Sequence, residues 1–230
     1  MPTDSDRVSH RNALQIRGVL FDMDGVLADS EEFIAEAARA MFLETYGLTV
    51  ALKDFLPFVG AGEDRYLGGV ASQYGIVPDL PRDKSRTYAL YGELIQGKLK
   101  PLPGAVAFVR ACRNQGLQTA LATSADQTKM VSTLAAIGLS EADFDATVNG
   151  LDIARKKPFP DIFLEAARRI GVPPKECLVV EDAVNGVKAA LAAGCSCLTL
   201  ATTFSEPELR AAGATTIIPD LSHADLKNYQ

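Results

Sequence analysis

The sequence has no dense run of lysine and arginine, which a nucleic-acid-binding face usually needs. Its most basic stretch is Arg155-Lys156-Lys157, and the formal net charge of the 230 residues is −6. An acidic chain without a basic run is poorly suited to binding a phosphate backbone. We therefore expect no nucleic-acid partner.

Cysteine is also scarce. The four cysteines lack the spacing of a zinc knuckle or of a redox C-x-x-C motif; they are Cys112, Cys177, Cys195 and Cys197. We therefore expect reduced and mostly buried thiols, as in the cytoplasm or another reducing compartment.

Long apolar runs are missing as well. No stretch approaches the roughly 20 residues that a membrane-spanning helix needs. Residues 1–15 mix charged and polar side chains and contain no apolar stretch, unlike a signal peptide. We expect no membrane association.

Short apolar runs alternate with helical patterns over most of the chain. The predicted strands are 19–21, 119–122, 146–148, 177–180, 196–200 and, at an edge, 216–218. The predicted helices are 105–115, 127–137, 161–170 and 184–193, each followed by a glycine suited to end a helix. This alternation predicts an α/β fold with a doubly wound parallel sheet.

One segment interrupts the alternation. Residues 30–100 contain helical patterns at 31–46, 67–74 and 82–96 and no predicted strand. Pro101-Leu102-Pro103-Gly104 then marks a boundary. We expect a helical domain of residues 30–100 inserted into an α/β core domain of residues 1–29 and 101–230.

Polar side chains follow the predicted strands where each strand ends. In open α/β sheets, ligands bind at the carboxyl ends of the strands, so these side chains should meet at one rim. They are Asp22 and Asp24, Thr123 and Ser124, and Glu181 and Asp182, with Lys157 in the loop before the helix at 161.

Single acids in this set have simpler explanations, because Asp24-Gly25 suits a turn and Asp182 could cap a helix. Four acids at two adjacent strand ends would repel one another unless a cation lay between them. Oxygen ligands in that number suit Mg²⁺. Lys157 and the Thr123 hydroxyl add the positive charge and donor that a phosphate needs.

Four strings in the sequence resemble, in order, the four signatures of the haloacid dehalogenase superfamily. They are residues 21–30 (FDMDGVLADS), 121–124 (LATS), 157–163 (KPFPDIF) and 180–187 (VEDAVNGV). The inserted helices resemble the helical cap of this superfamily, in the branch of β-phosphoglucomutase-like phosphatases. The strings at 58–63 and 67–72 are similar to those of a dehalogenase-like domain found in plants.

The resemblance implies a role for each matching residue. Asp22 would be the nucleophile and Asp24 the general acid and base. Asp22, Asp182, Glu181 and the Asp24 carbonyl would hold Mg²⁺, while Thr123, Ser124 and Lys157 would bind phosphate. Two positions depart from the usual pattern, because Phe159 stands where a small residue is common and Lys156 where glycine or serine is common.

The expected activity is hydrolysis of a small phosphate monoester through an aspartyl-phosphate, by a monomer. A phosphomutase of the β-phosphoglucomutase type and a catalytically silent interaction domain remain as alternatives. At the position where such a mutase carries histidine, this chain has Ile34. The position of the mutase's phosphate-binding arginine falls near Glu63. We expect cap residues 60–65, with Glu63 and Arg65, to face the site and to determine specificity.

Overall fold

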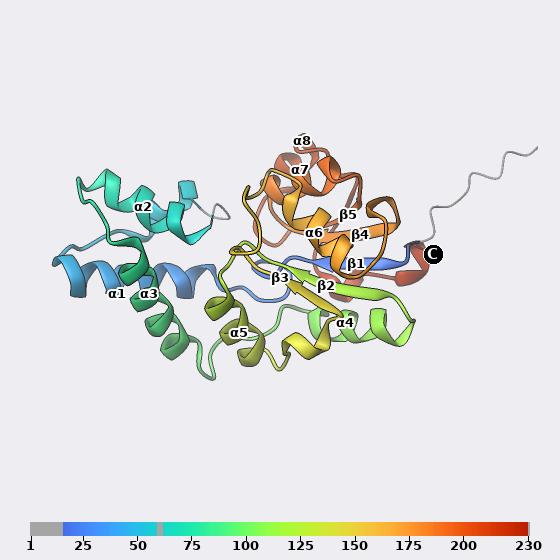
Figure 1. Ribbon diagram of the computed structural model, residues 1–230, viewed down its shortest axis with the longest axis horizontal. Coiled ribbons are helices and arrows are strands. Elements are labelled where there is room, and N and C mark those ends of the chain that lie inside the picture. The colour runs from blue at the N-terminus through green and yellow to red at the C-terminus, as the bar shows by residue number, and fades with distance from the viewer. Residues whose placement is uncertain (1–15, 59–61, 230) are drawn as a thin grey trace, which may run out of the picture.

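The chain forms a six-stranded parallel sheet with helices on both faces (Figure 1). The computed structural model describes residues 16–58 and 62–229. The strand order is β3-β2-β1-β4-β5-β6. The strands are β1 Gly18–Phe21, β2 Gln118–Ala122, β3 Ala146–Val148, β4 Cys177–Glu181, β5 Ser196–Leu200 and β6 Thr216–Ile218.

Alternate residues of the central strand β1 enter two separate hydrophobic cores. Val19 and Phe21 pack on the face covered by α4 (Ala105–Asn114) and α5 (Gln127–Ala136). Leu20 packs on the opposite face, with the second group of helices. These are α6 Asp161–Arg169, α7 Val184–Ala192 and α8 Glu206–Ala211. Because both faces of the sheet are covered, β1 is apolar along its whole length.

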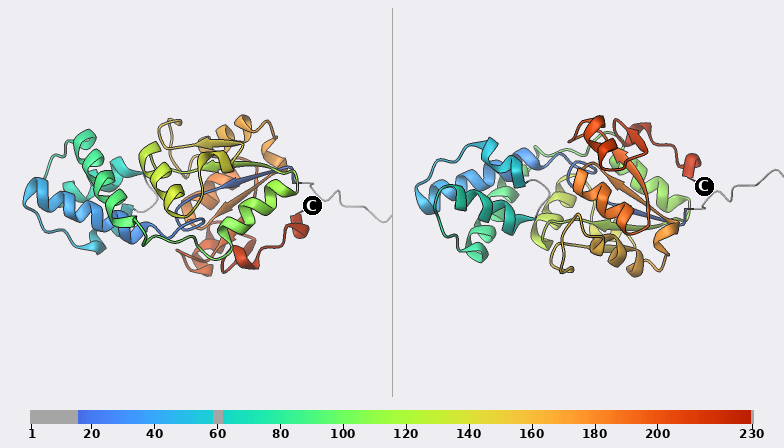
Figure 2. Two further views of the ribbon diagram at one scale, coloured as in Figure 1. Left: turned by 90° about the horizontal axis from the view of Figure 1, so that it is seen from below. Right: turned by 90° about the horizontal axis from the view of Figure 1, so that it is seen from above.

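A bundle of helices lies beyond the carboxyl ends of the strands (Figures 1 and 2). It contains α1 Glu31–Tyr46, the 3₁₀ helix η1 Leu52–Phe58, α2 Glu63–Gln73 and α3 Leu80–Ile95. Helices α1 and α3 pack along each other. No strand occurs among the described residues between 31 and 95.

The two chain segments that join this bundle to the sheet run side by side. Ala28 pairs with Pro101 in an antiparallel bridge, and the amide of Leu102 donates to the carbonyl of Leu27 at 2.9 Å. Both connections therefore lie close to the end of β1. The predicted division into a core domain and an inserted helical domain remains a prediction.

The prediction of an α/β fold with a parallel sheet is confirmed, and all six predicted strands are present. The helical bundle differs more, because η1 was not predicted and α2 begins at Glu63 instead of residue 67. Helix α3 begins at Leu80, where the Asp79 side chain accepts from the Arg82 amide at 3.3 Å. Short 3₁₀ helices complete the described chain at Glu141–Asp143, Pro174–Glu176, Leu221–His223 and Leu226–Tyr229.

In the part of the chain that the structure describes, no helix is both long and apolar enough to cross a membrane.

Candidate active site

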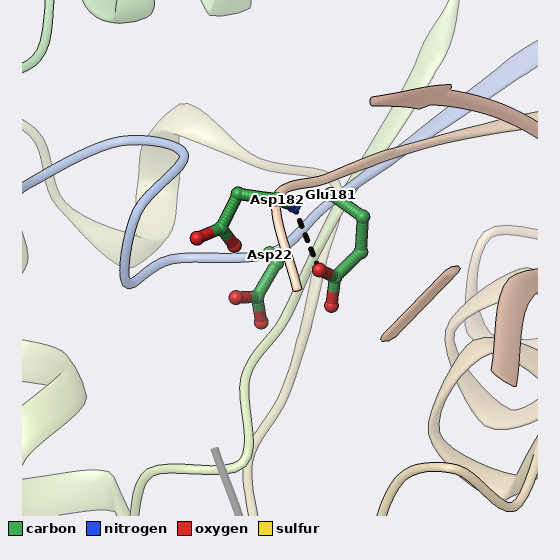
Figure 3. Close-up of side chains that lie close together, drawn as sticks. All are labelled: Asp22, Glu181 and Asp182. Atoms are coloured by element: carbon green, nitrogen blue, oxygen red, sulfur yellow. Dashed lines mark hydrogen bonds between the residues drawn. The ribbon is translucent and has the colours of Figure 1, made fainter. Parts of the chain in front are cut away.

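Three carboxylates meet where the neighbouring strands β1 and β4 end (Figure 3). Asp22 directly follows β1, Glu181 is the last residue of β4 and Asp182 comes next. One oxygen from each lies within 4.8 Å of the others. All three side chains are buried, so their negative charges would repel one another strongly when all are ionised.

Lys157 supplies one positive charge to this group. Its buried Nζ lies 2.7 Å from Asp22 Oδ1 and 2.6 Å from Glu181 Oε1. The other Glu181 oxygen, Oε2, accepts from the amides of Asp182 at 2.8 Å and Ala183 at 2.7 Å. Both oxygens of Glu181 therefore have protein donors, and this side chain acts as a fixed support for the lysine.

Asp182 is buried with one oxygen unsatisfied. No described residue forms a hydrogen bond with its Oδ1. Its Oδ2 lies so close to Gly25, which has φ +75°, that a Cβ at Gly25 would overlap it. Only glycine allows the β1 loop to approach this carboxylate so closely.

The site carries more negative charge than its lysine can balance. Burial, with the neighbouring Glu181 and Asp24 charges, outweighs Lys157 and raises the pKa of Asp22 to about 7. Burial also raises the pKa of Asp182 well above its usual range. A divalent cation beside Asp22 and Asp182 would restore their ionised forms and satisfy Oδ1. Hard oxygen donors of this kind fit Mg²⁺.

Asp24 lies two residues after Asp22 in the same loop, and each of its carboxylate oxygens has a hydrogen-bond partner. Its Oδ1 accepts from the Ser30 hydroxyl, and its Oδ2 accepts from Lys129 Nζ at 2.9 Å. Lys129 belongs to α5 and was not among the residues predicted from the sequence. No motif marks it, and a lysine on a helix ordinarily indicates a solvent-facing position.

The two hydroxyl residues after β2 lie in different surroundings. Thr123 Oγ1 accepts from the Ala125 amide at 3.1 Å and so fixes the loop. Ser124 Oγ is buried, and within the described residues it has no hydrogen-bond partner. Ser124 lines the cleft next to the acids.

A cleft of about 320 Å³ lies above these groups, between the sheet and the helical bundle. Its sheet side includes the acids, Lys157 and Ser124. Its bundle side is formed mainly by apolar groups and two carboxylates, namely Ile34, Leu56, Pro57, Phe58, Tyr66, Glu31 and Glu63.

The predicted specificity segment 60–65 is only partly in this cleft. Gly62 and Glu63 line it, whereas exposed Arg65 lies on an adjoining groove with Arg155 and Phe159. Gly60 and Ala61 fall outside the described residues.

The two departures from the expected third signature leave Lys157 in place. Phe159 is 49% exposed, and the Arg155 guanidinium lies 4.9 Å from its ring centre. The Lys156 ammonium contacts the Gly150 carbonyl. Both side chains point to partners outside the acid cluster, so they do not compete with Lys157.

Comparison with known proteins connects this geometry to one family. Residues 16–194 match the haloacid dehalogenase-like hydrolases. The chain is 43% identical over 222 residues to the chloroplastic protein SUPPRESSOR OF QUENCHING 1 of Arabidopsis thaliana, covering 93% of this chain and 20% of that protein. It is 32% identical to a phosphorylated carbohydrates phosphatase of Thermotoga maritima, over 78% of this chain and 82% of the relative.

A solved structure has the same architecture. A hydrolase from Pseudomonas syringae superposes with a TM-score of 0.79 at 28% identity, covering 93% of this chain and 97% of its own. The chain spans only about a fifth of the Arabidopsis protein but most of the Thermotoga relative. On the family match over most of its length, the chain belongs to the haloacid dehalogenase-like hydrolases.

Proposed function

We propose that this protein is a Mg²⁺-dependent phosphatase that hydrolyses a small phosphate monoester through an aspartyl-phosphate on Asp22. The observation that carries the proposal is the position of Asp22 at the carboxyl end of β1. Its Oδ1 bonds Lys157, and its carboxylate shares a buried cluster with Glu181 and Asp182. Lys157 in turn can neutralise a phosphate oxygen brought beside Asp22.

The phosphate would be bound by groups already on the sheet side of the cleft. Lys157 provides a buried positive charge, and Ser124 has an unsatisfied hydroxyl that can donate to a phosphate oxygen. Thr123, bonded to the Ala125 amide, holds the loop that presents Ser124 and can share its own hydroxyl proton with the phosphate.

Asp22, Asp182 and the Asp24 carbonyl would hold the Mg²⁺, with Glu181 behind them. The bound ion would supply positive charge to offset the phosphate charge and to keep Asp22 ionised. The unsatisfied Asp182 oxygen supports this assignment.

In the first half-reaction, an Asp22 carboxylate oxygen attacks phosphorus and forms a new O–P bond. The bond from phosphorus to the substrate oxygen breaks, and that oxygen leaves as an alcohol with the proton of Asp24. In the second, water attacks phosphorus and gives a proton to the Asp24 carboxylate. Inorganic phosphate leaves, and Asp22 and Asp24 return to their starting forms.

The bundle side of the cleft favours a monophosphate over a bisphosphate. Ile34 cannot donate a hydrogen bond, and Glu63 would repel a second phosphate. The nearby cation, Lys129, already pairs with Asp24 and approaches Glu63. We therefore propose a sugar monophosphate or similar metabolite as substrate, in line with the name of the Thermotoga relative. Glu63 in the cleft and Arg65 in the adjoining groove are the proposed determinants of which ester fits.

A phosphate-release screen over sugar phosphates, phosphoglycolate and nucleotides tests the proposed function. We expect hydrolysis of at least one ester with Mg²⁺, none with excess chelator, and recovery when Mg²⁺ is returned. Interconversion of β-glucose 1-phosphate and glucose 6-phosphate, primed by the bisphosphate, would instead identify a mutase. Hydrolysis of no ester in the presence of Mg²⁺ would contradict the proposal.

We also propose that the protein acts as a monomer in a reducing compartment. The four buried, unbridged cysteines support the reducing compartment. Its Arabidopsis relative is a chloroplastic protein, so such a compartment need not be the cytoplasm. Size-exclusion chromatography with light scattering at micromolar concentration would contradict the first part if it gave twice the chain mass.

A further inference from the structure

Lys129 is a buried lysine to which the proposed mechanism gives no role. It is the third residue of α5, and only 3% of it is exposed. Its Nζ lies 2.9 Å from Asp24 Oδ2, 3.7 Å from Glu63 Oε1 and 5.9 Å from the ring centre of Tyr91. It thus contacts the β1 loop and the helical bundle at once.

The surroundings of Lys129 keep it charged. Burial alone would lower the pKa of its ammonium, but the nearby carboxylates of Asp24, Glu63 and Glu31 outweigh burial and raise it. Removing an ammonium from water is unfavourable unless its partners are well placed. Lys129 is therefore a fixed cation whose shortest contact is with Asp24.

The Asp24 carboxylate is held from two sides. The Ser30 hydroxyl contacts Oδ1, and Lys129 bonds Oδ2. These two donors fix the position of the Asp24 carboxylate, whose oxygens can accept a proton from water. The second half-reaction of the proposed phosphatase needs such an acceptor at a fixed place, because the attacking water must give up its proton there.

We infer that Lys129 is a positioning residue for the second half-reaction, holding the Asp24 carboxylate where it receives the proton of the water that hydrolyses the aspartyl-phosphate. The inference rests on the proposed function. The first half-reaction should not depend on Lys129 when the substrate is an activated ester, because a good leaving group departs without a proton.

The kinetics of Lys129→Met on p-nitrophenyl phosphate test this role. We expect kcat to fall at least about tenfold, with KM falling in proportion and kcat/KM staying within about twofold. Phosphoenzyme should accumulate, seen as a nitrophenol burst near one equivalent per site or as an 80 Da addition to Asp22 by mass spectrometry. Lys129→Arg should recover much of the lost kcat.

A second lysine offers a matched control. Lys84 on α3 joins the bundle to the core through Asp126 at 2.8 Å and Asp64 at 2.7 Å, without contacting Asp24. Lys84→Met should leave kcat and the phosphoenzyme fraction near wild-type values. Lys129→Gln, which keeps a donor for Asp24 without the charge, provides a milder second variant if Lys129→Met lowers the thermal midpoint sharply.

Equal losses in kcat and kcat/KM for folded Lys129→Gln, without added phosphoenzyme, would overturn the inference. Wild-type kinetics in both Lys129→Met and Lys129→Gln would also overturn it. Failure of the proposed function has a different signature, because wild-type protein with Mg²⁺ would then release no nitrophenol and form no phosphoenzyme at all.

Discussion

At the scale of single residues, the site is defined by buried carboxylates that lack enough positive charge. Asp22 and Asp182 both lie within the cluster, while Lys157 already divides its hydrogen bonds between Asp22 and Glu181. The unsatisfied Asp182 oxygen is the clearest sign of this imbalance. The folded protein is therefore expected to bind protons or a cation here.

This imbalance predicts how stability depends on pH. Because the pKa of Asp22 is raised to about 7 and that of Asp182 is raised as well, the folded state holds protons that the unfolded state releases above about pH 4. In chelator, the free energy of unfolding should fall as pH rises from about 4 to about 7. We expect a thermal midpoint roughly 5 °C lower at pH 8 than at pH 5 from this effect.

Magnesium should reverse that loss, and more strongly at pH 8 than at pH 5. Differential scanning calorimetry with Mg²⁺ or chelator measures both effects. Asp182→Asn should reduce the difference between the two pH values, whereas Glu206→Gln, at an exposed surface pair with Arg210, should leave it unchanged. Equal Mg²⁺ shifts at the two pH values would contradict the explanation.

Asp22 and Asp182 could be predicted from the sequence because each lies just after a short apolar run. Such a run indicates a buried strand, and the end of that strand is where the fold places its ligand site. Lys129 could not be predicted in the same way. Its burial depends on α3 packing against α5, a contact between segments about 40 residues apart, and its partners Asp24 and Glu63 are more distant still along the chain.

At the scale of helices and strands, the same contrast appears. The strands were predictable because each is a short apolar run, and the central ones are buried along their whole length, as β4 is from Cys177 to Glu181. The 3₁₀ helix η1 was not, because exposed Leu52 and Leu56 give it no regular apolar face. The start of α2 at Glu63 has no side-chain cap to mark it, because the residue before it is Gly62.

A buried carboxylate joins two helices of the bundle. Asp83 of α3 is fully buried and accepts from the Tyr46 hydroxyl of α1 at 2.5 Å and from Arg82 Nε at 2.8 Å. Asp83→Ala should lower the free energy of unfolding by about 2–3 kcal/mol, because it leaves the Tyr46 hydroxyl without its acceptor and removes this hydrogen bond between α1 and α3.

Urea denaturation followed by circular dichroism measures this change. Glu93→Ala, at an exposed position on the same helix, should change the free energy of unfolding by less than about 0.5 kcal/mol. A loss below about 1 kcal/mol for Asp83→Ala would show that the buried contact is dispensable.

At the scale of the whole molecule, the two parts of the structure have separate tasks. The sheet places the acids, Lys157 and Ser124 at one rim, and the helical bundle closes the space above them to about 320 Å³. A volume of that size suits a small molecule and not a polymer. The connecting segments meet at Ala28 and Pro101, beside the end of β1. Any movement of the bundle would therefore shift the loop that carries Asp22 and Asp24.

The central claim is that Asp22 is the nucleophile. Asp22→Asn keeps the shape of the side chain and removes the charged oxygen that attacks phosphorus, so we predict a loss of at least about a hundredfold in kcat with Mg²⁺. Asp29→Asn, at an exposed carboxylate further along the same loop, should keep wild-type activity. Thermal unfolding of both variants checks that the fold is intact.

The most direct measurement is intact-mass and peptide mass spectrometry after rapid acid quench of the working enzyme. The mechanism predicts an 80 Da addition confined to the peptide that contains Asp22, absent from Asp22→Asn and absent in chelator. A folded Asp22→Asn variant that retains more than about a tenth of the wild-type kcat, or an addition on another residue, would contradict it.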